Sequence, residues 1–267
     1  MNEKGLQVLE QYDIRLQRSF GGRGSLMLET DQGLKLLKEF AGSQTKLPCE
    51  QALLERLEER RVCGVDRIVP NRSGNLVSIG DYDTPYILKN WPPGRECDPR
   101  NEEELQRSMR TLARIHREAR GVWQLGEEEK RKCAGTERLR ELEKHNRELK
   151  RAQSFIRNRH KKGSFELLFL QCAEAVFRDG RLALEKLEAS GCGELYERAL
   201  REEHVCHGEY IHHNILISRQ ETAVVNFQHF EINVQVNDIC LFLRKIMEKQ
   251  NWNGRLAARM LEAYERE

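Results

Sequence analysis

The fold is decided by one stretch of the sequence, HGEYIHHN at residues 207–214. A carboxylate, Glu209, is followed five residues later by an amide, Asn214. Two short apolar segments come next, ILI at 215–217 and AVV at 223–225, and the second leads to Asn226 just before an aromatic residue. Phosphoryl transfer needs this arrangement, because its chemistry is mostly positioning and metal charge. The carboxylate would orient an attacking hydroxyl, while the two amides would hold Mg²⁺ ions that bridge nucleotide phosphates.

The stretch resembles the catalytic loop and metal loop of the aminoglycoside phosphotransferase and choline kinase-like family, which has a protein-kinase-like fold. The family pattern reads His-x-Asp-x-x-x-x-Asn, followed by an apolar strand that ends in Asp. His207 and Asn214 match this pattern, whereas Glu209 stands at the first Asp and Asn226 at the second. The resemblance therefore implies catalytic positions at His207 and Glu209, metal positions at Asn214 and Asn226, and ATP with Mg²⁺ as cofactors.

The N-terminal part of the chain predicts a small sheet. Three strands are expected at about 12–19, 26–30 and 34–40, with a glycine-rich turn at 20–25, and further short strands at 65–69, 76–79 and 86–88. In the turn, Gly21, Gly22 and Gly24 would let backbone N–H groups approach phosphate oxygens. A glycine-rich turn of this kind is more often an ordinary flexible hairpin than a phosphate-binding loop.

Lys38 is the candidate for the lysine that contacts the α- and β-phosphates of a nucleotide. Lys35 is its rival, but the two have opposite strand parity. Pro48 can open a helix, and on this helix Glu50 is the expected partner of Lys38, with Glu55 as the alternative. The alternatives without a function are that Lys38 is a solvated strand lysine and that Glu50 and Glu55 are exposed glutamates.

A hinge is expected at residues 89–94, where Trp91, Pro92, Pro93 and Gly94 break regular structure. Adenine would lie against this hinge. We therefore expect an α+β fold of the two-lobed, protein-kinase-like (aminoglycoside phosphotransferase-like) type. Its small antiparallel-sheet lobe would cover residues 1–90, and its mainly helical lobe would cover residues 91–267.

The helical lobe should begin with a helix capped by Asn101 and ending near His116, which we interpret as structural. Residues 126–162 predict a long helix or helix pair packed along this lobe, and residues 164–187 a strongly apolar helix buried in its core. Residues 157–162 form a basic cluster. It could meet phosphate groups or an acidic partner, but a solvated helix end is the more common meaning.

The composition fits a globular chain without a strong electrostatic bias. Among 267 residues, 39% are apolar and 33% charged, and the net charge is +2, so nucleic acid is not an expected partner. No apolar run approaches the roughly 20 residues that span a bilayer, and residues 1–5 lack the apolar core of a signal peptide. We expect synthesis in the cytoplasm. The eight cysteines include no Cys-x-x-Cys pair, which favours reduced thiols.

A second, more specific resemblance runs with gaps over most of the chain and is strongest over residues 204–253. The segments VNF at 225–227, VQVND at 234–238 and FLRKIMEK at 242–249 carry it, together with Trp252. They are similar to the CotS-type spore coat proteins of endospore-forming bacteria, a branch of the same superfamily. This similarity implies a role in coat assembly, other spore coat proteins as partners, and a final location in the spore coat.

Two hypotheses follow for the activity. The first is a kinase-fold binding or scaffolding protein with a degenerate phosphotransfer site. The second is an active ATP-dependent kinase that phosphorylates a hydroxyl of a small molecule. Glu209 extends its carboxylate by one methylene, and a misplacement of about 1 Å can cost on the order of 100-fold in rate. Asn226 removes a negative charge from the metal site, and so it is the residue that separates the two hypotheses.

Overall fold

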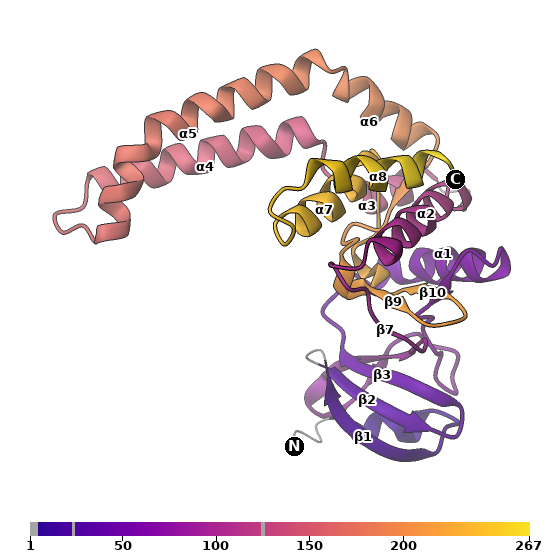
Figure 1. The fold of residues 1–267 in the computed structure, drawn as a ribbon. Coiled ribbons are helices and arrows are strands. Elements are labelled where there is room, and N and C mark those ends of the chain that lie inside the picture. Colours follow the sequence, from indigo (N-terminus) through magenta and orange to yellow (C-terminus); the bar gives the residue numbers. More distant parts are fainter. Residues whose placement is uncertain (1–4, 23–24, 124–125) are drawn as a thin grey trace.

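The computed structural model describes residues 5–22, 25–123 and 126–267. A small half built on an antiparallel sheet lies against a larger, mainly helical half (Figure 1). The N-terminal end lies at the sheet, and the C-terminal end belongs to the last helix of the larger half. The expected two-lobed α+β fold is therefore confirmed.

The small half contains a five-stranded antiparallel sheet in the order β1-β2-β3-β6-β5. Its strands are β1 (Leu16–Gly22), β2 (Ser25–Thr30), β3 (Gly33–Glu39), β5 (Ser78–Ile79) and β6 (Pro85–Asn90). One face packs on a small core that includes Tyr12, Leu37 and Leu88, closed by the short helix η1 (Leu6–Gln11). The second and third strands agree with the sequence prediction, whereas the first begins at Leu16 and not near residue 12, and Gly21 and Gly22 belong to β1 and not to the turn.

The register between β3 and β6 decides which side chains face the larger half. Lys38 lies opposite Ile87, and Leu36 lies opposite Lys89. Residues at alternate positions share one face of a sheet, so Lys38 and Lys89 are diagonal neighbours on the same face. Lys35 lies on the other face, where its Nζ donates to Asn90 Oδ1 at 2.7 Å.

Helix α1 (Leu47–Glu59) begins with Pro48 near its first turn, as predicted. Its leucines 53, 54 and 57 are fully buried and join the main core of the larger half. The short strand β4 (Gly64–Val65), expected at 65–69, pairs in parallel with β10 (Thr222–Val224). It therefore belongs to the second sheet, in the order β4-β10-β9-β7, which also contains β9 (Ile215–Ile217) and β7 (Arg95–Glu96). Segments before residue 90 thus contribute to the core and the sheet of the larger half.

Three helices organise the core of the larger half. Helix α2 (Glu102–Glu118) is capped by Asn101, whose side chain accepts hydrogen bonds from the N–H groups of residues 103 and 104. It packs against α8 (Gly254–Glu265), next to α7 (Val236–Met247). A two-stranded ladder of β8 (Val205–Cys206) and β11 (Glu231–Ile232) brackets the catalytic loop. This loop is therefore held from both ends by ordered structure.

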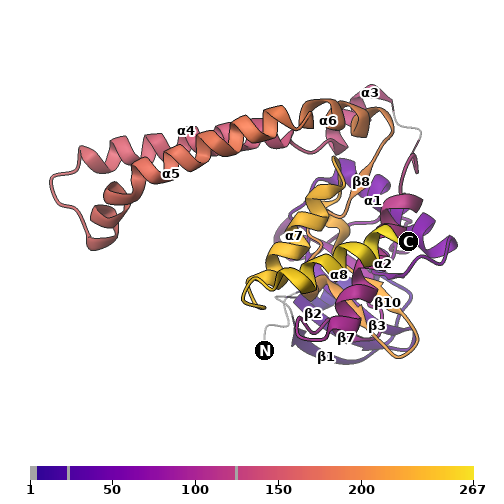
Figure 2. The ribbon, with the colours of Figure 1, turned by 45° about the horizontal axis from the view of Figure 1, so that its top comes forward.

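A helical arm projects from the larger half (Figures 1 and 2). It follows α3 (Glu127–Cys133) and consists of α4 (Arg138–Arg157) and α5 (Ser164–Ala189), joined back to the core by α6 (Cys192–Arg201). The predicted burial of α5 in the core is wrong. Only Ala173 and Phe177 of α5 are buried, and Phe165 is 75% exposed, because α5 packs mainly against α4 and leaves its other face open. The basic cluster forms the tip of the arm, where Arg159 is paired with Glu166.

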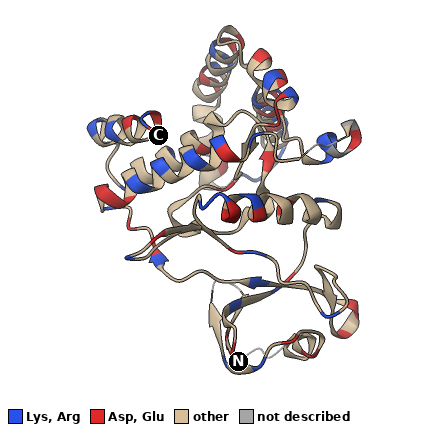
Figure 3. Ribbon diagram, turned by 90° about the vertical axis from the view of Figure 1, so that its right-hand side faces the viewer, with Lys and Arg blue, Asp and Glu red and all other residues tan. Residues whose placement is uncertain are grey.

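The surface agrees with the composition. Charged residues of both signs are distributed over both halves (Figure 3). None of the eight cysteines, all of which lie among the described residues, forms a disulfide. Over residues 5–22, 25–123 and 126–267, no helix combines the length and the apolar character needed to cross a membrane.

Candidate functional site

The catalytic loop is held by Asp238, a residue of the first turn of α7. The N–H groups of His207 and Gly208 donate to its two carboxylate oxygens at 2.6 and 3.0 Å, and His116 Nε2 lies 3.0 Å from Oδ2. Burial raises the pKa of Asp238, but the hydrogen bonds from the His116 ring and from the N–H of His207 outweigh it, so the net pKa is lowered. Asp238 therefore remains a carboxylate and steadies the loop.

Gly208 cannot be replaced without moving the loop. Its φ is 81°, a left-handed conformation that side chains rarely adopt, and a Cβ at this position would lie 2.0 Å from the carbonyl oxygen of His229. The catalytic loop and the segment after Asn226 therefore touch backbone to backbone.

His207 is fully buried, so its ring does not reach a substrate. Nε2 donates to the carbonyl of Val225 at 3.0 Å, and Nδ1 accepts from the N–H of Glu209 at 3.1 Å. Burial lowers the pKa of His207, which favours the neutral ring that this pattern of one donor and one acceptor requires. Within the predicted catalytic pair, His207 is a positioning residue that orients the backbone of Glu209.

Glu209 presents the carboxylate of the site. Its side chain is 43% exposed, and Oε2 lies 3.7 Å from Nε2 of His229. Its charge is also close enough to Lys38 to raise the pKa of that lysine. A carboxylate with this exposure can accept a hydrogen bond from the hydroxyl of a substrate.

The two amides of the predicted metal site bind each other. Asn226 Nδ2 donates to Asn214 Oδ1 at 2.9 Å, while Asn214 Nδ2 donates to the carbonyl of Glu209, also at 2.9 Å. Asn226 has a left-handed backbone with φ of 68°, which asparagine tolerates. The structure therefore brings Glu209, Asn214 and Asn226 together, and the side-chain oxygen of Asn214 accepts its hydrogen bond from the amide of Asn226.

Lys38 reaches from β3 to the loop that follows Asn226, where its Nζ donates to Gln228 Oε1. Burial lowers the pKa of Lys38 most, the neighbouring charge of Lys89 lowers it further, and Asp66, Glu50 and Glu209 oppose these effects. Lys38 therefore points toward the loops of the candidate site, whereas Lys35 lies on the other face of the sheet. The phosphate-binding role of Lys38 stays a prediction. No feature of the sequence pointed to Gln228 as a neighbour of Lys38.

Glu50 binds Lys89 and not Lys38, which corrects the expected ion pair. Lys89 Nζ is completely buried and lies 2.7 Å from Glu50 Oε1 and 3.0 Å from Asp66 Oδ2. Burial lowers the pKa of Lys89, but the two carboxylates outweigh it and raise the net pKa, so Lys89 stays charged. Asp66 Oδ2 also accepts the N–H of Asn226 at 3.0 Å. In the sequence, only the alternation of side chains along its strand could have indicated that Lys89 faces Glu50. No sequence motif indicated that Asp66 belongs to the same cluster.

The glycine-rich turn is only partly described. A Cβ at Gly21 would meet open space, and one at Gly22 would lie 3.1 Å from Met27 Cγ. Gly21 is therefore not required for packing, whereas a side chain at Gly22 would force Met27 to shift by a few tenths of an ångström. Gly24 lies outside the described residues.

The side chains at the site fit a nucleotide phosphate better than they fit Mg²⁺. Lys38 can bind a phosphate. For the metal, however, the catalytic and metal loops offer one carboxylate and two amides, and hard cations prefer several charged oxygen ligands. Within the described part of the chain, no three His, Cys, Asp or Glu side chains are grouped so that they could hold a metal ion. The site can position a hydroxyl and a phosphate, but it carries little of the negative charge that fixes Mg²⁺.

Comparisons with known proteins define the class of fold. No family model and no curated protein sequence matches the chain. Among solved structures, an aminoglycoside phosphotransferase from Alicyclobacillus acidocaldarius has a TM-score of 0.79 at 19% identity, with coverage of 97% of this chain and 76% of that one. Spectinomycin phosphotransferase in complex with ADP and spectinomycin has a TM-score of 0.67 at 12% identity, with coverage of 97% and 78%. Amicoumacin kinase in complex with AMP-PNP and Ca²⁺ has a TM-score of 0.60 at 16% identity, with coverage of 99% and 78%.

These likenesses establish that the protein has the aminoglycoside phosphotransferase fold. Identities of this size define the fold and leave the activity to the residues of this chain.

Proposed function

We propose that the chain is a kinase-fold protein with a degenerate phosphotransfer site that acts by binding or scaffolding in spore coat assembly. The observation that carries the degenerate site is the hydrogen bond between the amides of Asn226 and Asn214. With Asp at 226, and Asn214 oriented as it is here, two acceptor oxygens would face each other, an arrangement that a bound cation stabilises. With Asn, an N–H fills that role, so the loop is stable without metal.

The charge at the site supports the same proposal. Transition states of phosphoryl transfer are stabilised mainly by fixed charges and metal ions, and this stabilisation is strongest where water is excluded. Asn226 removes one of those charges, and Asp66, the nearby buried acid, is engaged by Lys89 and by the N–H of Asn226. The remaining carboxylate, Glu209, would orient the hydroxyl of the acceptor, and so it is not available as a metal ligand.

The proposed role in the spore coat rests on the resemblance over residues 204–253. Its partners would be other spore coat proteins, and its location the coat of an endospore-forming bacterium. A fluorescent fusion expressed from the native promoter during sporulation should label the coat. Label that stays in the mother-cell cytoplasm after coat formation would contradict this role.

The alternative is an active small-molecule kinase, and the placement of Lys38 and Glu209 on facing sides of the cleft favours it. Structures with this fold include enzymes in complex with nucleotides, among them spectinomycin phosphotransferase with ADP. An enzyme of this kind would bind ATP with Mg²⁺ and tolerate the substitutions at 209 and 226.

A thermal-shift titration with ATP, with and without Mg²⁺, separates the two functions. We expect no Mg²⁺-dependent rise in melting temperature for the natural sequence. Lys38→Ala tests the cleft, and Lys35→Ala is its matched control, because Lys35 lies on the same strand but on the opposite face. A Mg²⁺-dependent rise that is lost in Lys38→Ala and kept in Lys35→Ala would establish the kinase alternative.

A further inference from the structure

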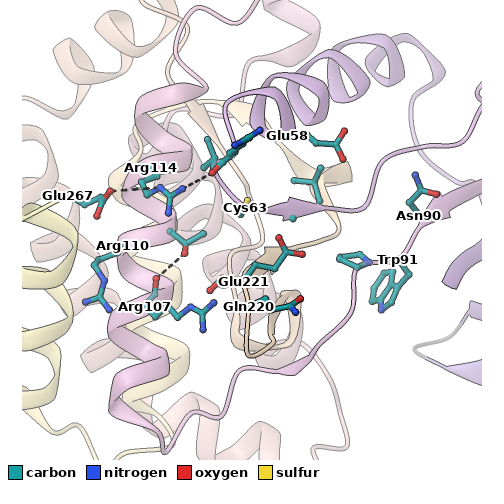
Figure 4. Close-up of a pocket in the computed structure, with 17 residues that line it drawn as sticks. Glu58, Cys63, Asn90, Trp91, Arg107, Arg110, Arg114, Gln220, Glu221 and Glu267 are labelled. Atoms are coloured by element: carbon teal, nitrogen blue, oxygen red, sulfur yellow. Dashed lines mark hydrogen bonds and ion pairs between the residues drawn. The ribbon is translucent and has the colours of Figure 1, made fainter. Parts of the chain in front are cut away.

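A cavity of about 670 Å³ lies beside the hinge, and none of the residues of the candidate catalytic site lines it (Figure 4). One wall is α2. The others are the end of α1 with β4, the hinge residues 90–92, and the turn between β9 and β10. Its volume lies in the range of about 300–1,000 Å³ that is typical of small-molecule sites.

Arginines dominate the helical wall of the cavity. Arg107, Arg110 and Arg114 are spaced by three and four residues on α2, and this spacing puts them on one face of the helix (Figure 4). Arg61 joins them from the loop after α1. Four arginine residues therefore line a single cavity, and Arg110 also lines a smaller pocket between α2 and α8.

Two of these arginines have no acidic partner among the described residues. Arg107 Nη1 reaches only the carbonyl of Ser218, at 3.3 Å, and no carboxylate lies within 4.0 Å of Arg107 or Arg110. Other arginines of the protein are paired, such as Arg117 with Glu118 at 3.4 Å. Arg107 and Arg110 thus keep their binding capacity for an anion.

The three acidic residues that line the cavity do not pair with Arg107 or Arg110. Glu58 is engaged by Arg67 at 2.9 Å, and Glu267 lies 3.9 Å from Arg114. The third acid, Glu221, belongs to the turn between β9 and β10, and its carboxylate lies near Gly64 on the opposite side from α2. The charge that faces the cavity from α2 is therefore positive.

We propose that this cavity is a second binding site that takes a small polyanion with two or more phosphate or carboxylate groups. Guanidinium groups are planar forks that bind both kinds of anion through paired N–H groups, which makes Arg107 and Arg110 the anchors. The hinge residue Trp91 lines the same cavity and packs against Leu216, Ala223 and Val225, which lie between the catalytic loop and Asn226. A bound anion therefore lies against the segment that connects the two halves.

Isothermal titration calorimetry of the full chain with inorganic pyrophosphate and, separately, with citrate tests this site at constant ionic strength and without Mg²⁺ or nucleotide. Binding of pyrophosphate alone assigns a phosphate site, binding of citrate alone assigns a carboxylate site, and binding of both assigns a general polyanion site. The double variant Arg107→Gln/Arg110→Gln should weaken binding on the order of tenfold or more, because each guanidinium contributes charge-assisted hydrogen bonds.

Two controls make the result specific. Arg201→Gln/Arg255→Gln removes the same charge from exposed positions outside the cavity and should keep the affinity. Lys38→Ala removes the lysine of the cleft and should also keep it. Absence of binding for both anions would overturn the proposal, as would loss of binding in Lys38→Ala with full binding in the double variant. If the double variant fails to fold, Arg110→Gln alone decides, since the side chain of Arg110 makes no hydrogen bond or ion pair with the described residues.

Discussion

Glu50 Oε1 lies 2.7 Å from Nζ of Lys89, so the acid of α1 is neutralised by the strand before the hinge and not by the lysine of β3. Both groups are almost fully buried, with side-chain exposures of 0% for Lys89 and 4% for Glu50. A buried charge that loses its partner is costly, whereas a partly exposed one is screened by water. The two cleft lysines therefore have different roles: Lys89 is structural, and Lys38 is available to a ligand.

Lys89→Met should lower the free energy of unfolding by about 3–5 kcal/mol, because Glu50 and Asp66 would be left as uncompensated buried carboxylates. Urea denaturation followed by circular dichroism measures this loss. Lys38→Met is the matched control and should cost less than about 1 kcal/mol. The reverse order of the two losses would refute the assignment of roles.

Gly208→Ala should destabilise the protein more than Gly33→Ala. Both glycines have left-handed φ values, 81° and 88°, so both variants incur the backbone cost of about 1 kcal/mol. Only Gly208 adds a clash with the carbonyl of His229, since nothing lies within 4 Å of a Cβ at Gly33. Melting temperatures of the two variants provide the comparison, and equal losses would show that the loops can separate without cost.

Asn226→Asp should create a response to Mg²⁺ that the natural sequence lacks. The new carboxylate faces the oxygen of Asn214, and a divalent cation relieves the repulsion between these acceptors. ATP with Mg²⁺ should then raise the melting temperature by about 3 °C or more, while Asn226→Ala shows no such rise. If Asn226→Asp and the natural sequence respond alike, the amide at 226 is not what determines metal binding.

Stability should fall as the pH drops from about 6.5 to about 4. Burial lowers the pKa of His212 to about 4, helped by the charges of His213 and Lys249. In this window the unfolded chain takes up a proton on His212 and the folded chain does not, so acid favours unfolding; above pH 6.5 this contribution is constant. The expected loss is about 1–3 kcal/mol, measured by urea denaturation at pH 7 and pH 4.5. His212→Asn should reduce this dependence, and an unchanged slope would contradict it.

Phe177→Ala should loosen the helical arm without loosening the core. Phe177 is one of the few buried side chains of α5, and the arm makes few contacts with the rest of the large half. Hydrogen exchange should therefore speed up in α4 and α5 but not in α2 or α7. Val176→Ala, at a neighbouring exposed position, should leave exchange unchanged. Uniform acceleration over all helices would mean that the arm folds together with the core.

The sequence was informative where function is encoded in a contiguous stretch. The loop from His207 to Asn214, the strands that follow it and the helix caps are local features, and the structure places them as predicted. The partner of Glu50 could not be predicted, because it depends on the register of β3 against β6, two strands about 50 residues apart. The alternation of side chains along β6 shows that Lys89 faces Glu50 only when this register is known.

The burial of α5 could not be derived from its composition. Its apolar residues occur on more than one face, which is typical of a helix inside a core. Which face is covered, however, depends on where α4 and α6 direct the chain. Phe165 and Leu168 are exposed because the arm leaves the large half before these residues could reach it.

Asp66 has a consequence for motion. Its Oδ2 holds the ammonium group of Lys89, from the sheet-bearing half, and the main-chain N–H of Asn226, from the helical half. A rotation that spreads the halves apart must break one of these two contacts in a water-free environment. Together with the bonds of Glu50 to Lys89 and of Lys38 to Gln228, this carboxylate ties the sheet-bearing half to the helical half, so any separation of the halves requires several buried or half-buried contacts to break.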